Sequence, residues 1–294
     1  MSQTLLTQED VTASEPKQKG RLGVILIFAV LALFCVFALV PFYFMLVSSV
    51  KSGMELVRNG INIEFPIAKF TLNGYHTLFT NRDGIYFSWY KNSILITFFQ
   101  MICAIFLSAM VGYGLAVYRF KGRNLIFVMV LVVMMVPIEI LILPLYKLIT
   151  NLRLIDTYAG VILPFAVPPT AVFFFRQFAI GLPMELLDSG RIDGCSEMGI
   201  YFKIMMPLMK PAFGAMIILQ AMFSWNSFVW PLIALRSDQN LTLPIGLASL
   251  ITPYGNNYDM LMPGAVLSVI PVVIIFLLNQ KAFISGLTIG AVKE

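Results

Sequence analysis

The sequence predicts an all-α polytopic membrane protein with six transmembrane helices. Of its 294 residues, 59% are hydrophobic and only 12% are charged, whereas soluble domains are about one-quarter charged. The apolar residues occur in runs long enough to cross a bilayer as helices, about 20 residues each. These runs do not alternate as barrel strands must, so a helical bundle is the expected way to satisfy backbone polar groups in lipid.

Six apolar segments account for the expected spans. They cover approximately residues 22–47, 93–117, 125–146, 158–178, 211–235 and 264–278. Pro137 and Pro144 interrupt the third segment, and Pro164, Pro168 and Pro169 interrupt the fourth, because proline removes a helical hydrogen bond. Gly112 and Gly114 favour close helix contact near the end of the second. The aromatic residues before that span indicate an interfacial belt: Tyr86, Phe87, Trp89 and Tyr90.

The ends of the chain and its basic residues predict its orientation. Residues 1–20 are polar without an apolar period and are expected to form a disordered cytoplasmic tail, whereas 21–294 form the transmembrane domain. Six spans place both termini on one side. More Lys and Arg residues lie in the segments on that side than in those on the opposite side, and Arg119, Lys121 and Arg123 cluster in one short loop there. Because cytoplasmic loops are rich in Lys and Arg, we expect both termini to be cytoplasmic.

The histidine and cysteine residues and the absence of a nucleotide-binding motif predict neither an enzyme nor a metalloprotein. His76 alone cannot form a zinc site, and Cys35, Cys103 and Cys195 lack C-x-x-C spacing, which favours structural thiols. The sequence contains no phosphate-binding G-x-x-x-x-G-K-[ST] motif. We therefore expect no catalytic residue, metal or cofactor on this chain, and its net charge of +5 does not indicate a nucleic-acid partner.

Residues 183–210 lie between two apolar spans but contain many charged side chains. Their pattern predicts a short helix–turn–helix. Glu185 and Asp188 suit the first turn of a helix over 184–192. Asp193-Gly194 then favours a turn, and Ser196 suits the N-cap of a second helix. Five apolar side chains are available for contacts: Leu187, Ile192, Met198, Phe202 and Met205. The pattern fits an amphipathic helix on the membrane surface or a docking element for a partner.

The same stretch resembles the EAA loop of bacterial ATP-binding-cassette importer permeases. In that family a Gly follows the Glu of Glu-Ala-Ala by six residues, an Ile follows the Gly by ten, and Leu-Pro comes next. Here Asp188-Ser189-Gly190 stands in the Glu-Ala-Ala position, followed at these spacings by Gly194 and Ile204, with Met206-Pro207 in the Leu-Pro position. Asp188 is shorter than the family Glu, so Glu185 is an alternative for the expected ion pair with the ATPase.

The resemblance covers most of the chain, and its C-terminal part favours the carbohydrate-uptake subfamily of these permeases. Residues 242–247, 263–283 and 286–293 are similar to the six-span, maltose-type permease subunit of the carbohydrate-uptake subfamily. This implies a type I importer permease fold with cytoplasmic coupling helices in a bacterial cytoplasmic membrane. The implied partners are a second permease subunit in a heterodimer, two ATPase subunits that carry ATP and Mg, an extracytoplasmic sugar-binding protein, and lipid.

The resemblance also implies roles for particular residues. The coupling loop, about 183–207, would contact the ATPase through Glu185, Asp188, Ser189, Gly190, Arg191, Asp193, Gly194, Ile204 and Pro207. The loop at 236–262 would reach the binding protein through Tyr254, Asn256 and Asn257, or would be a connector only.

Some polar and aromatic residues of the spans are candidates for the translocation pathway. Glu139 either faces the sugar or pairs with another span. Trp225, Asn226 and Trp230 suit stacking on sugar rings, although such residues more often serve packing. The alternative function is an ion-coupled secondary transporter of small solutes. It is disfavoured because Glu139 is the one ionisable candidate in the spans and no internal repeat is visible.

Overall fold

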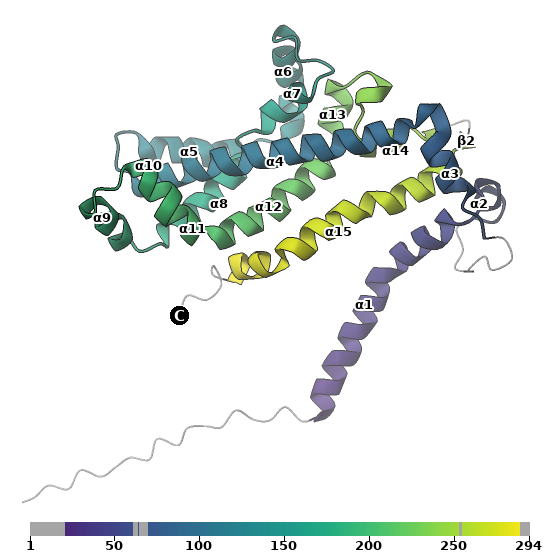
Figure 1. Ribbon diagram of the computed structural model, residues 1–294, viewed down its shortest axis with the longest axis horizontal. Coiled ribbons are helices and arrows are strands. Elements are labelled where there is room, and N and C mark those ends of the chain that lie inside the picture. The colour runs from purple at the N-terminus through teal and green to yellow at the C-terminus, as the bar shows by residue number, and fades with distance from the viewer. Residues whose placement is uncertain (1–20, 61–63, 65–69, 253–254, 289–294) are drawn as a thin grey trace, which may run out of the picture. The chain divides into compact units, whose positions relative to one another are not determined.

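The computed structural model describes residues 21–60, 64, 70–252 and 255–288 (Figure 1). The chain divides into two units, residues 1–44 and 45–294. The first unit contains most of helix α1 (Arg21–Ser49), a continuous apolar helix with Pro41 inside it. The predicted tail, residues 1–20, lies outside the described residues.

The second unit consists almost entirely of helices. In chain order its first elements are α2 (Gly53–Asn59), α3 (Asn73–Thr80), η1 (Asn81–Asp83), α4 (Ile85–Val117), α5 (Arg123–Met134), α6 (Ile138–Asn151), α7 (Tyr158–Ile162), η2 (Leu163–Phe165) and α8 (Pro169–Ile180). The remaining elements are α9 (Glu185–Ile192), α10 (Glu197–Ile200), the π-helical η3 (Tyr201–Met205), α11 (Met206–Leu208), α12 (Lys210–Trp225), α13 (Val229–Ala234), η4 (Asp238–Asn240), α14 (Leu243–Ala248), the hairpin β1 (Ile251–Thr252) and β2 (Gly255–Asn256), and α15 (Tyr258–Thr288).

The helices agree with the six predicted spans when bent pairs are counted as single spans. Among the described residues, Gly23–Ser49, Ile85–Val117 and Tyr258–Lys281 are each long and apolar enough to cross a membrane. Three further pairs qualify together: α5 with α6 at 104°, Tyr158–Phe165 with α8 at 43°, and Glu197–Leu208 with α12 at 77°. Two bends lie where prolines interrupted the sequence pattern, because Pro137 caps α6 and Pro168 caps α8.

The fifth span differs from its predicted extent of 211–235. Helix α12 ends at Trp225 and α13 begins at Val229. The side-chain amide of Asn226 donates to the carbonyl of Met222 at 2.9 Å, in the last turn of α12. Because Pro231 has no N–H, it cannot continue the hydrogen-bond pattern across the break.

Helix α4 organises the second unit. It packs against α8, α12 and α14, with α9 and α10 beyond its Val117 end and α3 and α14 beside its Ile85 end (Figure 1). Small buried residues allow this close approach. At Gly112 an added Cβ would lie 2.8 Å from backbone atoms of both Val172 and Arg176 in α8, which confirms the predicted close contact there. The prediction is wrong for Gly114, where an added Cβ would meet no neighbouring atom of the described residues within 4 Å.

The expected aromatic belt at the start of α4 is wrong for two of its residues. Tyr86 and Trp89 are almost fully buried, whereas Phe87 is exposed. The Tyr86 hydroxyl donates to the carbonyl of Gly264 at 3.0 Å, and the Trp89 indole N–H donates to the carbonyl of Asp238 at 2.8 Å. These aromatic rings pack inside the chain because their polar atoms find backbone acceptors there.

Candidate functional site: a coupling loop and the polar surface at the other end of α4

The predicted helix–turn–helix is present. Helix α9 carries Glu185 and Asp188 in its first turn, and Gly194 has φ = +75°, a conformation that glycine adopts without strain. The N–H of Cys195 closes the end of α9 by donating to the carbonyl of Gly190 at 2.9 Å. Ser196 then caps α10, because its hydroxyl accepts from the N–H of Gly199 at 3.1 Å.

One face of this loop belongs to the core of the chain. Leu187, Gly190, Ile200 and Met205 are buried. A Cβ at Gly190 would lie 2.8 Å from the terminal methyl of Ile204. Packing therefore brings together two positions of the motif, Gly190 and Ile204. Glycine in place of the family Ala allows α9 to lie close to η3.

The opposite face is exposed. Of the five apolar residues expected to supply contacts, Leu187 and Met205 are in the core, while Ile192, Met198 and Phe202 expose 86%, 55% and 39% of their surface. Glu185 is also exposed and makes no ion pair with any residue that the structure describes. An exposed isoleucine in the same loop as Glu185 suits a surface that a protein partner covers.

Arg191 ties the two helices of the loop together. Its Nε lies 2.8 Å from Oε1 of Glu197 and its Nη1 lies 3.2 Å from Oδ1 of Asp188. The hydroxyl of Tyr118, just beyond α4, donates to Oε2 of Glu197 at 2.8 Å. The hydrogen bonds from Arg191 and then from Tyr118 lower the pKa of Glu197 and favour its charged form.

Sequence reasoning missed Glu197 and Tyr118. Glu197 could have been suspected from its place in the first turn of α10, but no sequence signal pairs it with Tyr118, 79 residues away. The structure also shows that Asp188 is engaged within the loop. Glu185 is therefore the less encumbered of the two carboxylates proposed for a partner's basic residue.

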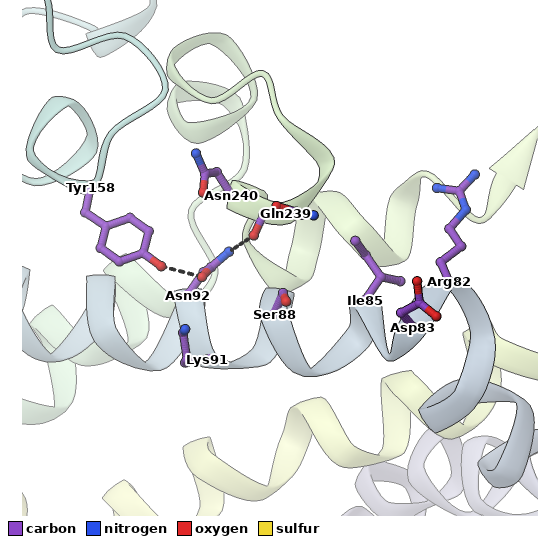
Figure 2. Close-up of a pocket in the computed structure, with 9 residues that line it drawn as sticks. All are labelled: Arg82, Asp83, Ile85, Ser88, Lys91, Asn92, Tyr158, Gln239 and Asn240. Atoms are coloured by element: carbon purple, nitrogen blue, oxygen red, sulfur yellow. Dashed lines mark hydrogen bonds between the residues drawn. The ribbon is translucent and has the colours of Figure 1, made fainter.

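A polar pocket of about 300 Å³ lies at the Ile85 end of α4 (Figure 2). Asn92 on α4 points towards the η4 segment, and its side-chain amide donates to the carbonyls of Gln239 and Leu241 at 2.7 and 2.9 Å. Its oxygen accepts from the hydroxyl of Tyr158. Asn92 is thus fully engaged in holding the segment that forms one wall of the pocket.

Asp156 holds the same segment from its other side. Its carboxylate accepts hydrogen bonds from the N–H groups of Arg236 and Ser237, at 2.9 and 3.1 Å, and from the hydroxyl of Ser237. Desolvation is the largest influence and opposes ionisation, but these bonds together with the Asn240 side chain outweigh it and lower the pKa of Asp156 to about 2. The segment 236–241 is therefore fixed by hydrogen bonds from two directions.

The pathway candidates are placed differently from one another. Trp225 and Trp230 are nearly buried and donate their indole N–H groups to the carbonyls of Ser268 and Gly160, both at 3.2 Å. In this chain they therefore serve packing. Glu139 is exposed in the first turn of α6, directly after the 104° bend, and Asn226 is exposed at the break after α12.

The candidates for binding-protein contact lie around the small hairpin. Tyr254 and the side chain of Asn256 lie outside the described residues, while the backbone of Asn256 pairs with Ile251. The N–H of Asn257 donates to the carbonyl of Leu250 at 2.9 Å, and its side-chain oxygen accepts from the N–H of Met260. Within the described part of the chain, no group of three His, Cys, Asp or Glu residues could hold a metal ion.

Comparison with known proteins identifies the family of this chain and several similar proteins. The family described as "Binding-protein-dependent transport system inner membrane component" matches residues 104–288. AraQ of Bacillus subtilis (strain 168), an arabinooligosaccharides transport system permease protein, is 57% identical over 273 residues, which are 93% of this chain and 96% of AraQ. LacG of Rhizobium radiobacter, a lactose transport system permease protein, is 29% identical over 275 residues, covering 94% of this chain and 98% of LacG.

A solved structure has a similar fold. It belongs to a bacterial ABC transporter involved in the import of the acidic polysaccharide alginate, and its TM-score to this chain is 0.77 at 22% sequence identity. The match covers 92% of this chain and 99% of the solved one. This likeness agrees with the mainly helical architecture described above.

Proposed function

Because this chain belongs to the binding-protein-dependent transport system inner membrane components, we propose that it couples sugar import to ATP hydrolysis through the α9–α10 loop. The family membership identifies it as a permease subunit of an ABC importer and a membrane component without its own ATPase. The predicted fold class, an all-α importer permease, is confirmed, and the described helices give six spans when each bent pair is counted as one.

The observation that supports the coupling role is the division of the loop into two faces. Leu187 and Gly190 anchor it on the core, while Ile192 and Glu185 project from it exposed. An element that is rigidly attached on one face and both apolar and acidic on the other suits a groove with basic residues in a partner. We assign that groove to the ATPase subunits, which would carry ATP and Mg.

The partners and orientation follow the family. A second permease subunit would complete the pathway, and a sugar-binding protein outside the cytoplasm would deliver the substrate to the Ile85 end of α4. In this orientation both termini, the 118–124 loop and the coupling loop are cytoplasmic, in keeping with the basic residues of that side. Transport would proceed by alternation between inward-facing and outward-facing states.

The proposed substrate class is a neutral oligosaccharide. AraQ, which shares 57% identity, is a permease protein for arabinooligosaccharides, so these are the first substrates to test. The exposed Glu139 and Asn226 are the proposed pathway residues of this subunit, because carboxylate and amide groups bind sugar hydroxyls.

The experiment is uptake of labelled arabinooligosaccharide by the complete complex in proteoliposomes. We expect uptake that requires ATP and is abolished by an ATPase-inactive partner, and that persists when a protonophore collapses the proton gradient. In the same preparation, Ile192→Glu should abolish co-purification of the ATPase, because it places a charge at the proposed apolar contact. Leu152→Glu, at an exposed position on the other side, should leave assembly intact. Uptake driven by an ion gradient without ATP would instead establish the secondary-transporter alternative.

A further inference from the structure

Tyr118 connects α4 to the coupling loop through a single carboxylate. Glu197 accepts from the Tyr118 hydroxyl at 2.8 Å with Oε2, and from Arg191 of α9 at 2.8 Å with Oε1. Glu197 itself begins α10. The end of α4 and both helices of the loop therefore share this group. Bidentate Arg–carboxylate pairs are directional, so a movement of α9 or α10 changes the position of the carboxylate that holds Tyr118.

The Ile85 end of α4 holds a second segment in the same manner. The indole of Trp89 donates to the carbonyl of Asp238 at 2.8 Å, and Asn92 donates to the carbonyls of Gln239 and Leu241. At the residue after Asn92, the hydroxyl of Ser93 accepts from the N–H of Leu243 at 2.7 Å. Four residues between η4 and the start of α14 are thus bonded to the first turns of α4, and one of them, Gln239, lines the pocket in Figure 2.

Between these two ends, α4 is continuous. It runs for 33 residues without proline, which corresponds to a length of about 50 Å at 1.5 Å per residue. The three other spans between α4 and α15 are each bent by more than 40°, and α15 contains Pro263 and Pro271. Close packing at Gly112 holds α4 along α8. A straight, densely packed helix transmits a displacement of one end to the other instead of absorbing it at a bend.

We propose that α4 is a connecting rod between the coupling loop and the outer segment 238–243, with Tyr118 and Glu197 as positioning residues at one end and Asn92 at the other. This inference rests on the proposed coupling function of the α9–α10 loop. It predicts that docking of a loaded binding protein near segment 238–243 displaces α4, and that this displacement moves the coupling loop against the ATPase. It also predicts that ATP-driven movement of the loop displaces segment 238–243 through the same helix.

The test uses the complete complex with its ATPase and binding protein in proteoliposomes, and measures sugar moved per ATP hydrolysed. Tyr118→Phe removes only the hydroxyl that binds Glu197. We expect it to lower this ratio and the stimulation of ATPase activity by loaded binding protein about tenfold, the effect of losing one hydrogen bond to a charged group. Assembly and basal ATPase activity should remain. Glu197→Ala should have the same effect, and Glu197→Gln, which retains an acceptor, a smaller one.

Tyr201→Phe is the matched control. Its hydroxyl is buried in the same cluster as Tyr113 and has no hydrogen-bond partner among the described residues, so its loss should leave coupling unchanged. Asn92→Ala tests the other end of α4 and should reduce binding-protein stimulation to a similar extent. Since both changes interrupt one connection, the double variant Tyr118→Phe/Asn92→Ala should be no worse than the more affected single variant.

The outcomes separate this inference from the proposed function. If the wild-type complex does not assemble with the ATPase or moves sugar without ATP, the proposed function is wrong and the inference falls with it. If the wild type couples normally and Tyr118→Phe equals Tyr201→Phe, the connecting rod alone is wrong. Multiplicative losses in the double variant would also overturn it, because independent sites add in free energy.

Discussion

Asp156 shows how a single carboxylate fixes the segment beside the polar pocket. It accepts hydrogen bonds from the backbone of Arg236 and Ser237, next to the segment that Asn92 binds. These bonds favour the ionised form and, although burial opposes it, lower the pKa from 3.8 to about 2. A group with a lowered pKa stabilises the folded state above its unfolded pKa, and this stabilisation is lost as the pH falls through the folded value.

We therefore predict that Asp156→Asn destabilises the protein at neutral pH but not in strong acid. The expected loss is about 1 kcal/mol at pH 7 after allowance for solvent screening, or about 2–4 °C in Tm. Thermal unfolding of the purified protein would show this difference shrinking between pH 4 and pH 2. Asp238→Asn is the control, because its ion pair with Arg82 is exposed on both sides and should contribute little. A difference that stays constant down to pH 2 would contradict the assigned pKa.

Residue-level predictability differed between local and distant interactions. The turn at Gly194 and the cap at Ser196 were predictable because both depend on neighbouring backbone atoms. The bonds from Tyr118 to Glu197 and from Asn92 to Gln239 join residues far apart in the chain. Nothing in a single sequence specifies such pairs, since each side chain is equally compatible with solvent.

Among the helices, α9 depends on a close approach at Gly190. An Ala at this position gains helix propensity of up to about 1 kcal/mol, while its Cβ presses on the terminal methyl of Ile204 at 2.8 Å, which can rotate away. We predict that Gly190→Ala stays within about 0.5 kcal/mol of wild type by thermal unfolding, because these effects offset each other.

Gly190→Leu is expected to behave differently. Its larger side chain cannot fit between α9, Ile200 and Ile204, and overpacking of this kind costs about 1–3 kcal/mol. The ATPase should then co-purify poorly, because the loop is displaced. The side chains proposed to contact the ATPase, Glu185 and Ile192, are unchanged in this variant, so displacement alone would account for the loss. If the Leu variant assembled and unfolded like the Ala variant, the close packing of α9 on η3 would be refuted.

Element-level prediction succeeded where hydrophobic runs and caps agreed. The run that became α4 has no proline and forms one helix, and α9 ends at the predicted turn. The run at 211–235 was misleading, because apolar composition continues through the break at Asn226. Prolines lie at the bends at Pro137 and Pro168, but Pro144 lies inside the continuous helix α6, so proline alone did not locate the bends. The bend angles of 104° and 43° depend on tertiary packing that composition does not encode.

Across the whole molecule, the residues proposed for coupling and those proposed for the translocation pathway lie on different structural features. The coupling loop is attached to a continuous helix, whereas the pathway candidates Glu139 and Asn226 lie at breaks in the spans, after α5 and after α12. Broken backbone and ionisable groups are tolerated within a membrane only where protein or water covers them. The bend before α6 is therefore expected to face the pathway or the second permease subunit and not the lipid.

This placement predicts the effect of changing Glu139. Glu139→Ala should lower sugar uptake by the complete complex at least tenfold, because a carboxylate bound to sugar hydroxyls contributes about 1.5–3 kcal/mol. Glu139→Gln, which retains one acceptor, should keep part of the activity. ATPase assembly should be unaffected in both, since the coupling loop is separate. Asp83→Asn, an exposed carboxylate outside the spans, is the matched control, and normal uptake by both Glu139 variants would remove this residue from the pathway.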